Sequence, residues 1–360
     1  MKSVYVKFLN IFALTALLLL LAGAVLVLVF DPFYHYHGPV LGLKSVVTKS
    51  EYQCIGTIRH FDYDSVMAGS STAENYNNHW FDQAFGCTTV KAIKSSGTTA
   101  DLKYYLDEAF ATHQIKNVFY SLDPFSLDGD PDNNFVNENM PLYLFDTNLL
   151  NDVKYLLNKD VLFEDIPYLL AVNFLEDHDE GTSYNWAQSK TFSKEGTLSH
   201  YYRTEEILEM IPAEEYQQRV DDNIALLEEQ LQAHPETTWY FFIPPYSMLW
   251  WDNAYRTGEM EKYRYLLETS MEVLAAYDNA RVYNFMHEEE IVLDLDKYMD
   301  LIHFSQQINY YLVEQAAADN SLYRVTADNY RVHLEKIDAI TEKILKEEMP
   351  ALFEKQEGAQ

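Results

Sequence analysis

The chain has 360 residues, of which 48% are apolar and 15% aromatic, so most of it should fold around a substantial core. Its formal charge of −30 argues against binding to nucleic acid, because neutralising phosphates requires clustered Lys and Arg. The simplest organisation is one large domain with an N-terminal anchor.

The first element is an uncharged, mostly apolar stretch over residues 8–30, which as a helix is long enough to cross about 30 Å of hydrocarbon. A cleaved signal peptide is the alternative, but the small residues 22–24 are followed by more apolar residues instead of a polar mature start. Lys2 and Lys7 precede the stretch and Asp31 follows it, which favours a cytoplasmic amino terminus. We therefore predict that residues 1–30 form a cytoplasmic tip and a single-pass anchor, with the rest of the chain extracytoplasmic at the cell membrane.

Residues 31–57 are predicted to be a juxtamembrane connector, because Pro and Gly residues interrupt any long period there. The only two cysteines are Cys54 and Cys87. In an oxidising compartment they are predicted to form a disulfide, and the alternative is two separate buried thiols.

Short β-rich runs alternate with helical segments through the remaining chain, residues 58–360. Strands are expected over residues 65–68, 88–93, 117–122, 239–243 and 281–285. This alternation predicts an α/β fold, a three-layer α/β/α domain with a five-stranded parallel sheet, preceded by the transmembrane helix. The carboxyl ends of such strands form the rim on which a functional site is expected.

The alternation loosens between residues 124 and 212, which we interpret as an insertion. Its aromatic side chains, concentrated over residues 143–174, could cover the site or rest near the membrane, although packing is their commoner use.

Ser71 follows the first expected strand and opens a helix-like segment. Backbone N–H groups at such a turn can stabilise the negative charge that develops on an acyl group during transfer. The alternative is a plain strand-to-helix turn in which Ser71 or Thr72 serves as a cap.

Asp300 and His303 follow the last expected strand and precede a helical run that starts near residue 305. A serine hydroxyl becomes a useful nucleophile when a histidine removes its proton and an acid orients that histidine. One such spacing could arise by chance in so acidic a chain, but its position on the same rim as Ser71 favours a shared site.

The chain resembles the SGNH (GDSL-like) acyl hydrolase superfamily, whose first sequence motif ends in a serine and whose last reads Asp-x-x-His. Ser71 and Asp300-Leu301-Ile302-His303 match these two motifs in order. The resemblance implies that Ser71 is the nucleophile, that His303 is the general base and later the acid, and that Asp300 fixes the imidazole tautomer. It also implies that the backbone N–H groups of Ser71 and Gly97 form the oxyanion site, although Gly97 could equally be a turn glycine.

Two positions depart from the superfamily pattern. Asp123 stands where a donor asparagine is usual, and Ser70 stands where an aspartate is usual. These departures resemble the divergent, membrane-anchored branch of DltD-like and alginate O-acetylation proteins. That branch implies an envelope glycan as substrate, contacted in part by Asp123, and a membrane-bound O-acyltransferase as the acyl donor, with no cofactor.

The segment after the fourth strand begins with two prolines that would rigidify a rim loop. Tyr246, Trp250 and Trp251 in this loop are predicted to bind substrate by stacking on sugar faces, with packing as the alternative. No metal site is expected, because the histidines lack partners at metal-ligand spacing.

Together these features predict a membrane-anchored serine esterase or O-acyltransferase, for acetyl groups, that acts on an envelope polysaccharide through an acyl intermediate on Ser71. The alternative is a catalytically inactive scaffold or glycan-binding protein of the same fold that serves in polymer assembly or export. Asp123 and Ser70 are the features that support this alternative.

Overall fold

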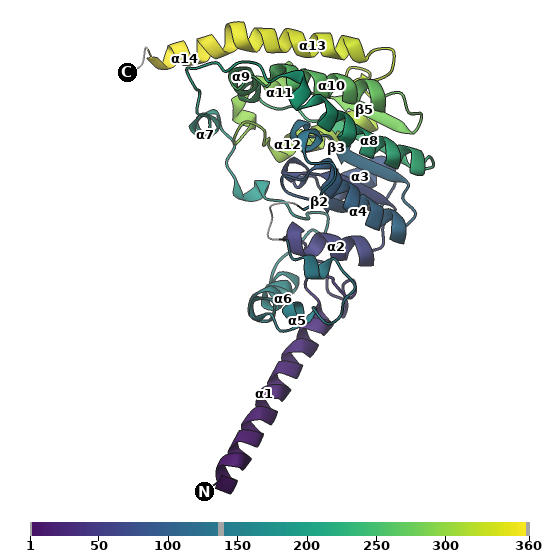
Figure 1. Cartoon of the computed structure of the whole chain (residues 1–360), viewed down its shortest axis with the longest axis vertical. Coiled ribbons are helices and arrows are strands. Elements are labelled where there is room, and N and C mark those ends of the chain that lie inside the picture. The colour runs from purple at the N-terminus through teal and green to yellow at the C-terminus, as the bar shows by residue number, and fades with distance from the viewer. Residues whose placement is uncertain (1, 136–139, 358–360) are drawn as a thin grey trace. The chain divides into compact units, whose positions relative to one another are not determined.

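The computed structural model describes residues 2–135 and 140–357 (Figure 1). The chain divides into two compact units. Unit 1 comprises Met1–Phe61 and Glu138–Gly181, and unit 2 comprises Asp62–Asn137 and Thr182–Gln360. The region expected as an insertion at 124–212 is therefore shared between the two units.

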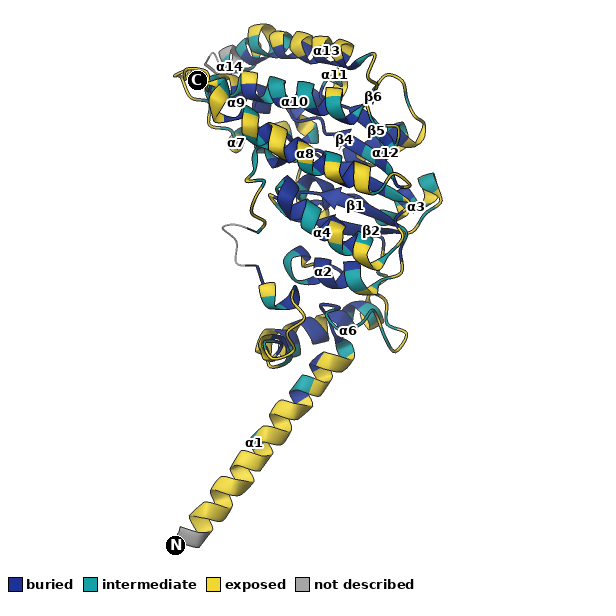
Figure 2. Ribbon diagram, turned by 45° about the vertical axis from the view of Figure 1, so that its right-hand side comes forward, coloured by how far each residue is buried: buried dark blue, intermediate teal, exposed yellow. Residues whose placement is uncertain are grey.

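Unit 1 begins with α1, Lys2–Phe30, which is long and apolar enough to span a membrane or act as a signal anchor. Most of its side chains are exposed, as Figure 2 shows. Among residues 4–30, the buried positions are Gly23 and Val27, in the last turns. There α1 contacts the short helix α5, Val153–Leu156, and the π-helical turn η4, Val161–Asp165.

The connector of unit 1 is more ordered than predicted, because it contains a helix, α2 (Ser50–His60). Gly56 is one of the glycines expected to interrupt regular secondary structure here, yet it lies inside this helix. A Cβ atom at Gly56 would lie 2.3 Å from the carbonyl oxygen of Phe33, so glycine is needed for the close approach of the chain after α1.

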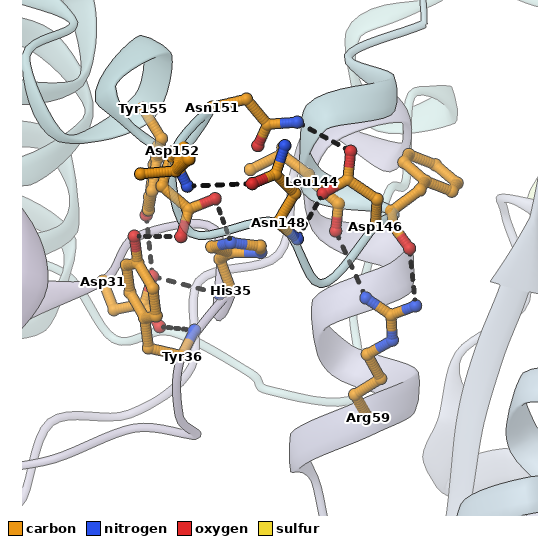
Figure 3. Close-up of polar contacts among 12 residues, drawn as sticks. Asp31, His35, Tyr36, Arg59, Leu144, Asp146, Asn148, Asn151, Asp152 and Tyr155 are labelled. Carbon is orange, nitrogen blue, oxygen red and sulfur yellow. Dashed lines mark hydrogen bonds and ion pairs between the residues drawn. The ribbon is translucent and has the colours of Figure 1, made fainter.

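A buried carboxylate, Asp31, organises the end of α1 (Figure 3). It accepts backbone N–H bonds from His35 at 3.0 Å and from Tyr36 at 2.7 Å, and a hydroxyl bond from Tyr155 of α5 at 2.8 Å. Asp152 in turn contacts the His35 ring at 3.3 Å and accepts the Tyr36 hydroxyl at 3.0 Å. These contacts fix α5 to the end of α1.

The last helix of unit 1 is α6, Ile166–Leu175. Its Leu169 and Val172 pack with Val46, and Phe30 at the end of α1 packs against this cluster. Asn173 fixes the helix further, because its Oδ1 accepts the Lys44 N–H at 2.7 Å and its Nδ2 donates to the Lys44 carbonyl at 3.1 Å.

Unit 2 is built on a mixed sheet of six strands in the order β2-β1-β3-β4-β5-β6. The first five pair in parallel at the predicted places, and their residues are mostly buried, as expected for a parallel sheet. The strands are β1 Ser65–Gly69, β2 Thr89–Ile93, β3 Asn117–Ser121, β4 Thr238–Ile243, β5 Ala280–Asn284 and β6 Arg324–Val325. The predicted count of five was wrong, because antiparallel β6 has only two residues and gives no periodic signal.

Helices of unit 2 connect the strands. Helix α8 contacts both α4 and α10, and α3 contacts α12. The α4 start carries a reciprocal cap, in which Thr98 and Asp101 each accept the other's backbone N–H. The longer helices are α3 Asn78–Phe85, α4 Thr99–Thr112, α8 Gln217–Ala233, α9 Met248–Arg256, α10 Met260–Leu274, α12 Gln306–Ala317, α13 Tyr330–Lys343 and α14 Met349–Glu357.

The predicted disulfide is not formed. Cys54 is a buried thiol in α2 and Cys87 is a partly buried thiol between α3 and β2. The sulfur of Cys87 lies 3.5 Å from both the Phe81 carbonyl oxygen and the Thr89 hydroxyl. The alternative of two separate thiols describes the structure.

Candidate active site

The site begins at the carboxyl end of β1, where the chain turns sharply after Gly69. A Cβ atom at Gly69 would lie 2.6 Å from the Cβ of Ala73 and 2.8 Å from that of Ser121, so only glycine lets the chain fold back here. Ser70 is extended and fully buried, and a single 3-10 turn follows over Ser71–Ala73. The Ser71 side chain remains partly exposed.

The structure brings Ser71 together with His303, which lies after β5 in the sequence. The hydroxyl oxygen of Ser71 lies 2.8 Å from Nε2 of His303. On the opposite side of the imidazole, Nδ1 lies 2.6 Å from Oδ2 of Asp300. Because the carboxylate can only accept, Nδ1 carries the proton in this pairing and Nε2 is left as the acceptor for the serine hydroxyl.

Asp300 is itself held by the backbone of its own loop. Its Oδ1 accepts the N–H of Ile302 at 2.9 Å and that of His303 at 2.8 Å. Burial acts to raise the pKa of Asp300, but the hydrogen bonds and the nearby imidazole of His303 outweigh it, and the pKa lies below its usual range. Asp300 therefore stays ionised at neutral pH.

The loop that carries Asp300 and His303 is attached to the segment after β4. Ser247 donates both its backbone N–H, at 3.1 Å, and its hydroxyl, at 2.7 Å, to the Leu301 carbonyl. The buried hydroxyl of Tyr298 donates to the Pro245 carbonyl at 2.7 Å. The rim loop predicted to bind substrate thus positions the imidazole.

The turn over Ser71–Ala73 is supported by the carboxylate of Asp123, which is fully buried at the end of β3. Ser70 donates its hydroxyl to this carboxylate at 2.7 Å and Thr72 donates at 3.0 Å. The Tyr246 hydroxyl donates at 2.6 Å. Burial raises the pKa of Asp123, while the three hydroxyl donors partly oppose that rise.

Four predicted site residues have different places from those expected. Asp123 and Tyr246 are fully buried, Trp251 is 1% exposed and Trp250 is 7% exposed, so none of them offers a surface for a sugar. The two indole rings pack edge to face on each other at 4.7 Å, and Trp250 packs similarly on Tyr246 at 5.1 Å. The alternative of packing therefore holds for these rings.

Gly97 also differs from its predicted role as an oxyanion donor. Its N–H donates to the Lys94 carbonyl at 2.8 Å, which closes a turn after β2. Ser96 in this turn has a positive φ of 53°, and a Cβ atom at Gly97 would lie 2.7 Å from the Lys94 carbonyl oxygen. Gly97 is a turn glycine whose donor is already used.

A tryptophan that the sequence pattern did not indicate lies beside the site. Trp186 donates its indole N–H to the Ser71 carbonyl at 3.0 Å, and its ring meets the His303 ring edge to face at 5.2 Å. The next residue, Ala187, donates its N–H to the Asn75 side chain at 3.0 Å. A single tryptophan within a long polar loop was the available signal.

The side chains that meet at Ser71 are partly exposed. The His303 and Asp300 side chains are 21% and 23% exposed. Asn75 is fully buried, and its amide nitrogen has no hydrogen-bond partner within the described part of the chain.

Among residues 2–135 and 140–357, no group of three or more His, Cys, Asp or Glu side chains is arranged to hold a metal ion.

Comparisons with known proteins give little further guidance. No family model matches the sequence, and no curated protein matches it. The chain is similar to a solved structure described as "a putative platelet activating factor from Streptococcus pneumonia", with 13% sequence identity and a TM-score of 0.39. That likeness covers 76% of this chain and 91% of the other. This identity and this TM-score are too low to indicate an activity.

Proposed function

We propose that the protein is a serine esterase or O-acyltransferase of the SGNH-like type, with Ser71 as nucleophile, His303 as base and Asp300 as the acid that orients the base. The observation that supports this most is the continuous pair of hydrogen bonds from Ser71 through His303 to Asp300, at 2.8 Å and 2.6 Å. Such a chain is what a hydroxyl needs to become nucleophilic at neutral pH.

The proposed reaction proceeds in two steps. Ser71 attacks the acyl carbonyl as His303 Nε2 takes the hydroxyl proton, and the imidazolium then gives that proton to the departing alkoxide. In the second step His303 removes a proton from water or a sugar hydroxyl, which attacks the acyl-serine, and the proton returns to Ser71. Asp300 stays ionised throughout and stabilises the imidazolium. The Ser71 backbone N–H remains the proposed donor to the oxyanion.

The proposed setting is the cell membrane, with α1 as the anchor and both units extracytoplasmic. The supporting feature is that α1 is long and apolar enough to span a bilayer or act as a signal anchor. The proposed substrate is an acetylated or acetyl-accepting envelope polysaccharide, and the proposed acyl donor for a transferase is a membrane-bound O-acyltransferase.

Hydrolysis of an activated acetyl ester by the full-length protein in detergent tests this proposal. We expect measurable turnover with 4-nitrophenyl acetate and its loss in Ser71→Ala and His303→Ala. Activity that survives Ser71→Ala would contradict the assignment. Folded protein without activity towards any acyl ester would instead favour the inactive scaffold, for which the departures at Ser70 and Asp123 would then be the cause.

A further inference from the structure

Unit 1 exposes a group of large apolar side chains that neither the fold nor the proposed reaction uses. They lie around α5, η4 and α6, which we call the collar, residues 149–175. Its most exposed members are Leu149 at 75%, Leu150 at 87%, Phe163 at 73%, Phe174 at 75% and Leu175 at 81%.

The helix α6 is apolar on both of its faces. One face, with Leu169 and Val172, packs into the core of unit 1. The other face leaves Tyr168, Phe174 and Leu175 exposed, and no residue of Ile166–Leu175 is charged. A helix that is apolar all round belongs in a protein core or in lipid, and only half of this one is covered by protein.

The position of α1 indicates which phase covers the collar. Crossing about 30 Å of hydrocarbon takes about 20 helical residues, so a span that starts at Phe8, just after Lys7, ends near Val27. The stripe of α1 that contacts α5 and η4 includes both Gly23 and Val27. A Cβ atom at Gly23 would lie 3.3 Å from Leu162 of η4. The contact between α1 and the collar therefore falls inside the apolar span, not beyond it.

The rest of this end of α1 remains apolar and uncovered, since Val25, Leu26, Leu28 and Val29 are all exposed. The collar elements α5 and η4 contact this same helix. The hydrogen bonds of Asp31 with Tyr155, and of Asp152 with His35 and Tyr36, hold α5 at that level (Figure 3).

We propose that the collar is seated in the lipid leaflet at the carboxyl end of α1, with Phe163, Phe174 and Leu175 inserted among the acyl chains. At 10 residues, α6 is too short to span the bilayer and lies in the interface. Charged neighbours such as Lys159 and Glu164 then lie at the level of the headgroups. The inference rests on the proposed membrane-spanning role of α1, and it does not depend on catalysis.

Tryptophan quenching by brominated lipid tests this proposed insertion into the leaflet. The full-length protein is placed in nanodiscs made with ordinary or bromine-labelled acyl chains, and Phe163→Trp and Phe174→Trp are compared with the parent protein. The parent's five tryptophans all lie in unit 2, and measuring the parent in both lipids gives the background that is subtracted. Leu19→Trp, at an exposed position of α1, serves as the positive control, and Tyr202→Trp, at an exposed position of unit 2, shows the response of a solvent-facing residue.

We expect brominated lipid to remove most of the fluorescence that Phe163→Trp and Phe174→Trp add, as it does for Leu19→Trp, and to leave that of Tyr202→Trp unchanged. Quenching of Leu19→Trp without quenching of Phe163→Trp and Phe174→Trp would overturn the collar proposal while leaving the anchor intact. Failure to quench Leu19→Trp would overturn both. Cover by a second copy or by another membrane protein would leave the collar positions unquenched, and neither outcome alters the esterase test.

Discussion

The turn around Ser71, residues 70–73, and the collar depart from the usual burial of polar and apolar side chains in opposite ways. At the turn, Ser70, Thr72 and Asp123 are polar and almost fully buried. In the collar, Phe163 and Phe174 are apolar and mostly exposed. Buried polar groups are tolerable when they are hydrogen-bonded, and they then specify one backbone shape. Exposed apolar groups have no such internal compensation, so they point to a phase outside the protein. The first region thus holds Ser71 in one backbone conformation. The second bears on where in the cell the protein lies.

The largest expected effect comes from Asp300→Asn, because the amide can place its NH2 group towards Nδ1 and leave the imidazole in the wrong tautomer. We expect kcat for an acetyl ester to fall by about 10⁴-fold with little change in KM. Steady-state kinetics at neutral pH measure this. A decrease of only a few fold would show that Asp300 does not orient His303.

The next effect concerns the buried support of the turn. Asp123→Ala leaves the hydroxyls of Ser70, Thr72 and Tyr246 without their common acceptor, so we expect the free energy of unfolding to fall by about 2–4 kcal/mol. Asp123→Asn keeps one acceptor oxygen and should lose less. Urea unfolding at fixed pH distinguishes them, and equal stability of both variants and the parent would refute a supporting role for the carboxylate.

The same carboxylate gives a pH dependence with a definite sign. Because burial raises the pKa of folded Asp123, the unfolded chain releases this proton at a lower pH than the folded chain does. The contribution of Asp123 to the free energy of unfolding therefore decreases as the pH rises from the ordinary value of the carboxyl to its raised value. Urea unfolding across the acidic range should show this slope in the parent and a weaker one in Asp123→Asn, and identical slopes would contradict it.

A smaller effect is expected at Trp186. Trp186→Phe keeps a ring beside His303 but removes the N–H that bonds to the Ser71 carbonyl. We expect the activation free energy to rise by about 1 kcal/mol, so that kcat/KM falls about five-fold. Trp186→Ala should cost more, because it also removes the ring contact. An unchanged kcat/KM in both variants would mean that the indole has no part in positioning the turn.

The smallest effect is expected on the exposed face of α6. In detergent solution, Phe174→Ser should change the free energy of unfolding by less than about 0.5 kcal/mol, because the side chain is exposed. Leu169→Ala, on the packed face, should cost about 2–5 kcal/mol. A large loss in Phe174→Ser in detergent would show that protein, not lipid, covers this face.

The sequence predicted well those features that depend on local pattern. The five parallel strands were located by β-rich runs, and the parallel arrangement placed Ser71 and the Asp300 to His303 loop on one rim. The features that depend on contacts between distant segments were not predictable in this way. Asp123 could be recognised only as a poor donor, because its three partners come from two separate segments of the chain.

Other errors have similar physical causes. Gly97 looked like a donor because the local sequence does not reveal that the Lys94 carbonyl already accepts its N–H. Gly56 looked like a helix break, but it serves a close approach inside a helix. The aromatic rim residues looked available, and only the packing of Trp250 between Tyr246 and Trp251 shows that they are not.

Covalent labelling shows whether Ser71 is a nucleophile that His303 activates. The full-length protein is treated with a fluorophosphonate, and the modified peptide is identified by mass spectrometry, with His303→Ala and Ser70→Ala as comparisons. We expect one adduct, on Ser71, that is abolished in His303→Ala and retained at Ser71 in Ser70→Ala. An adduct on another residue, or labelling of Ser71 that is unaffected by His303→Ala, would contradict it.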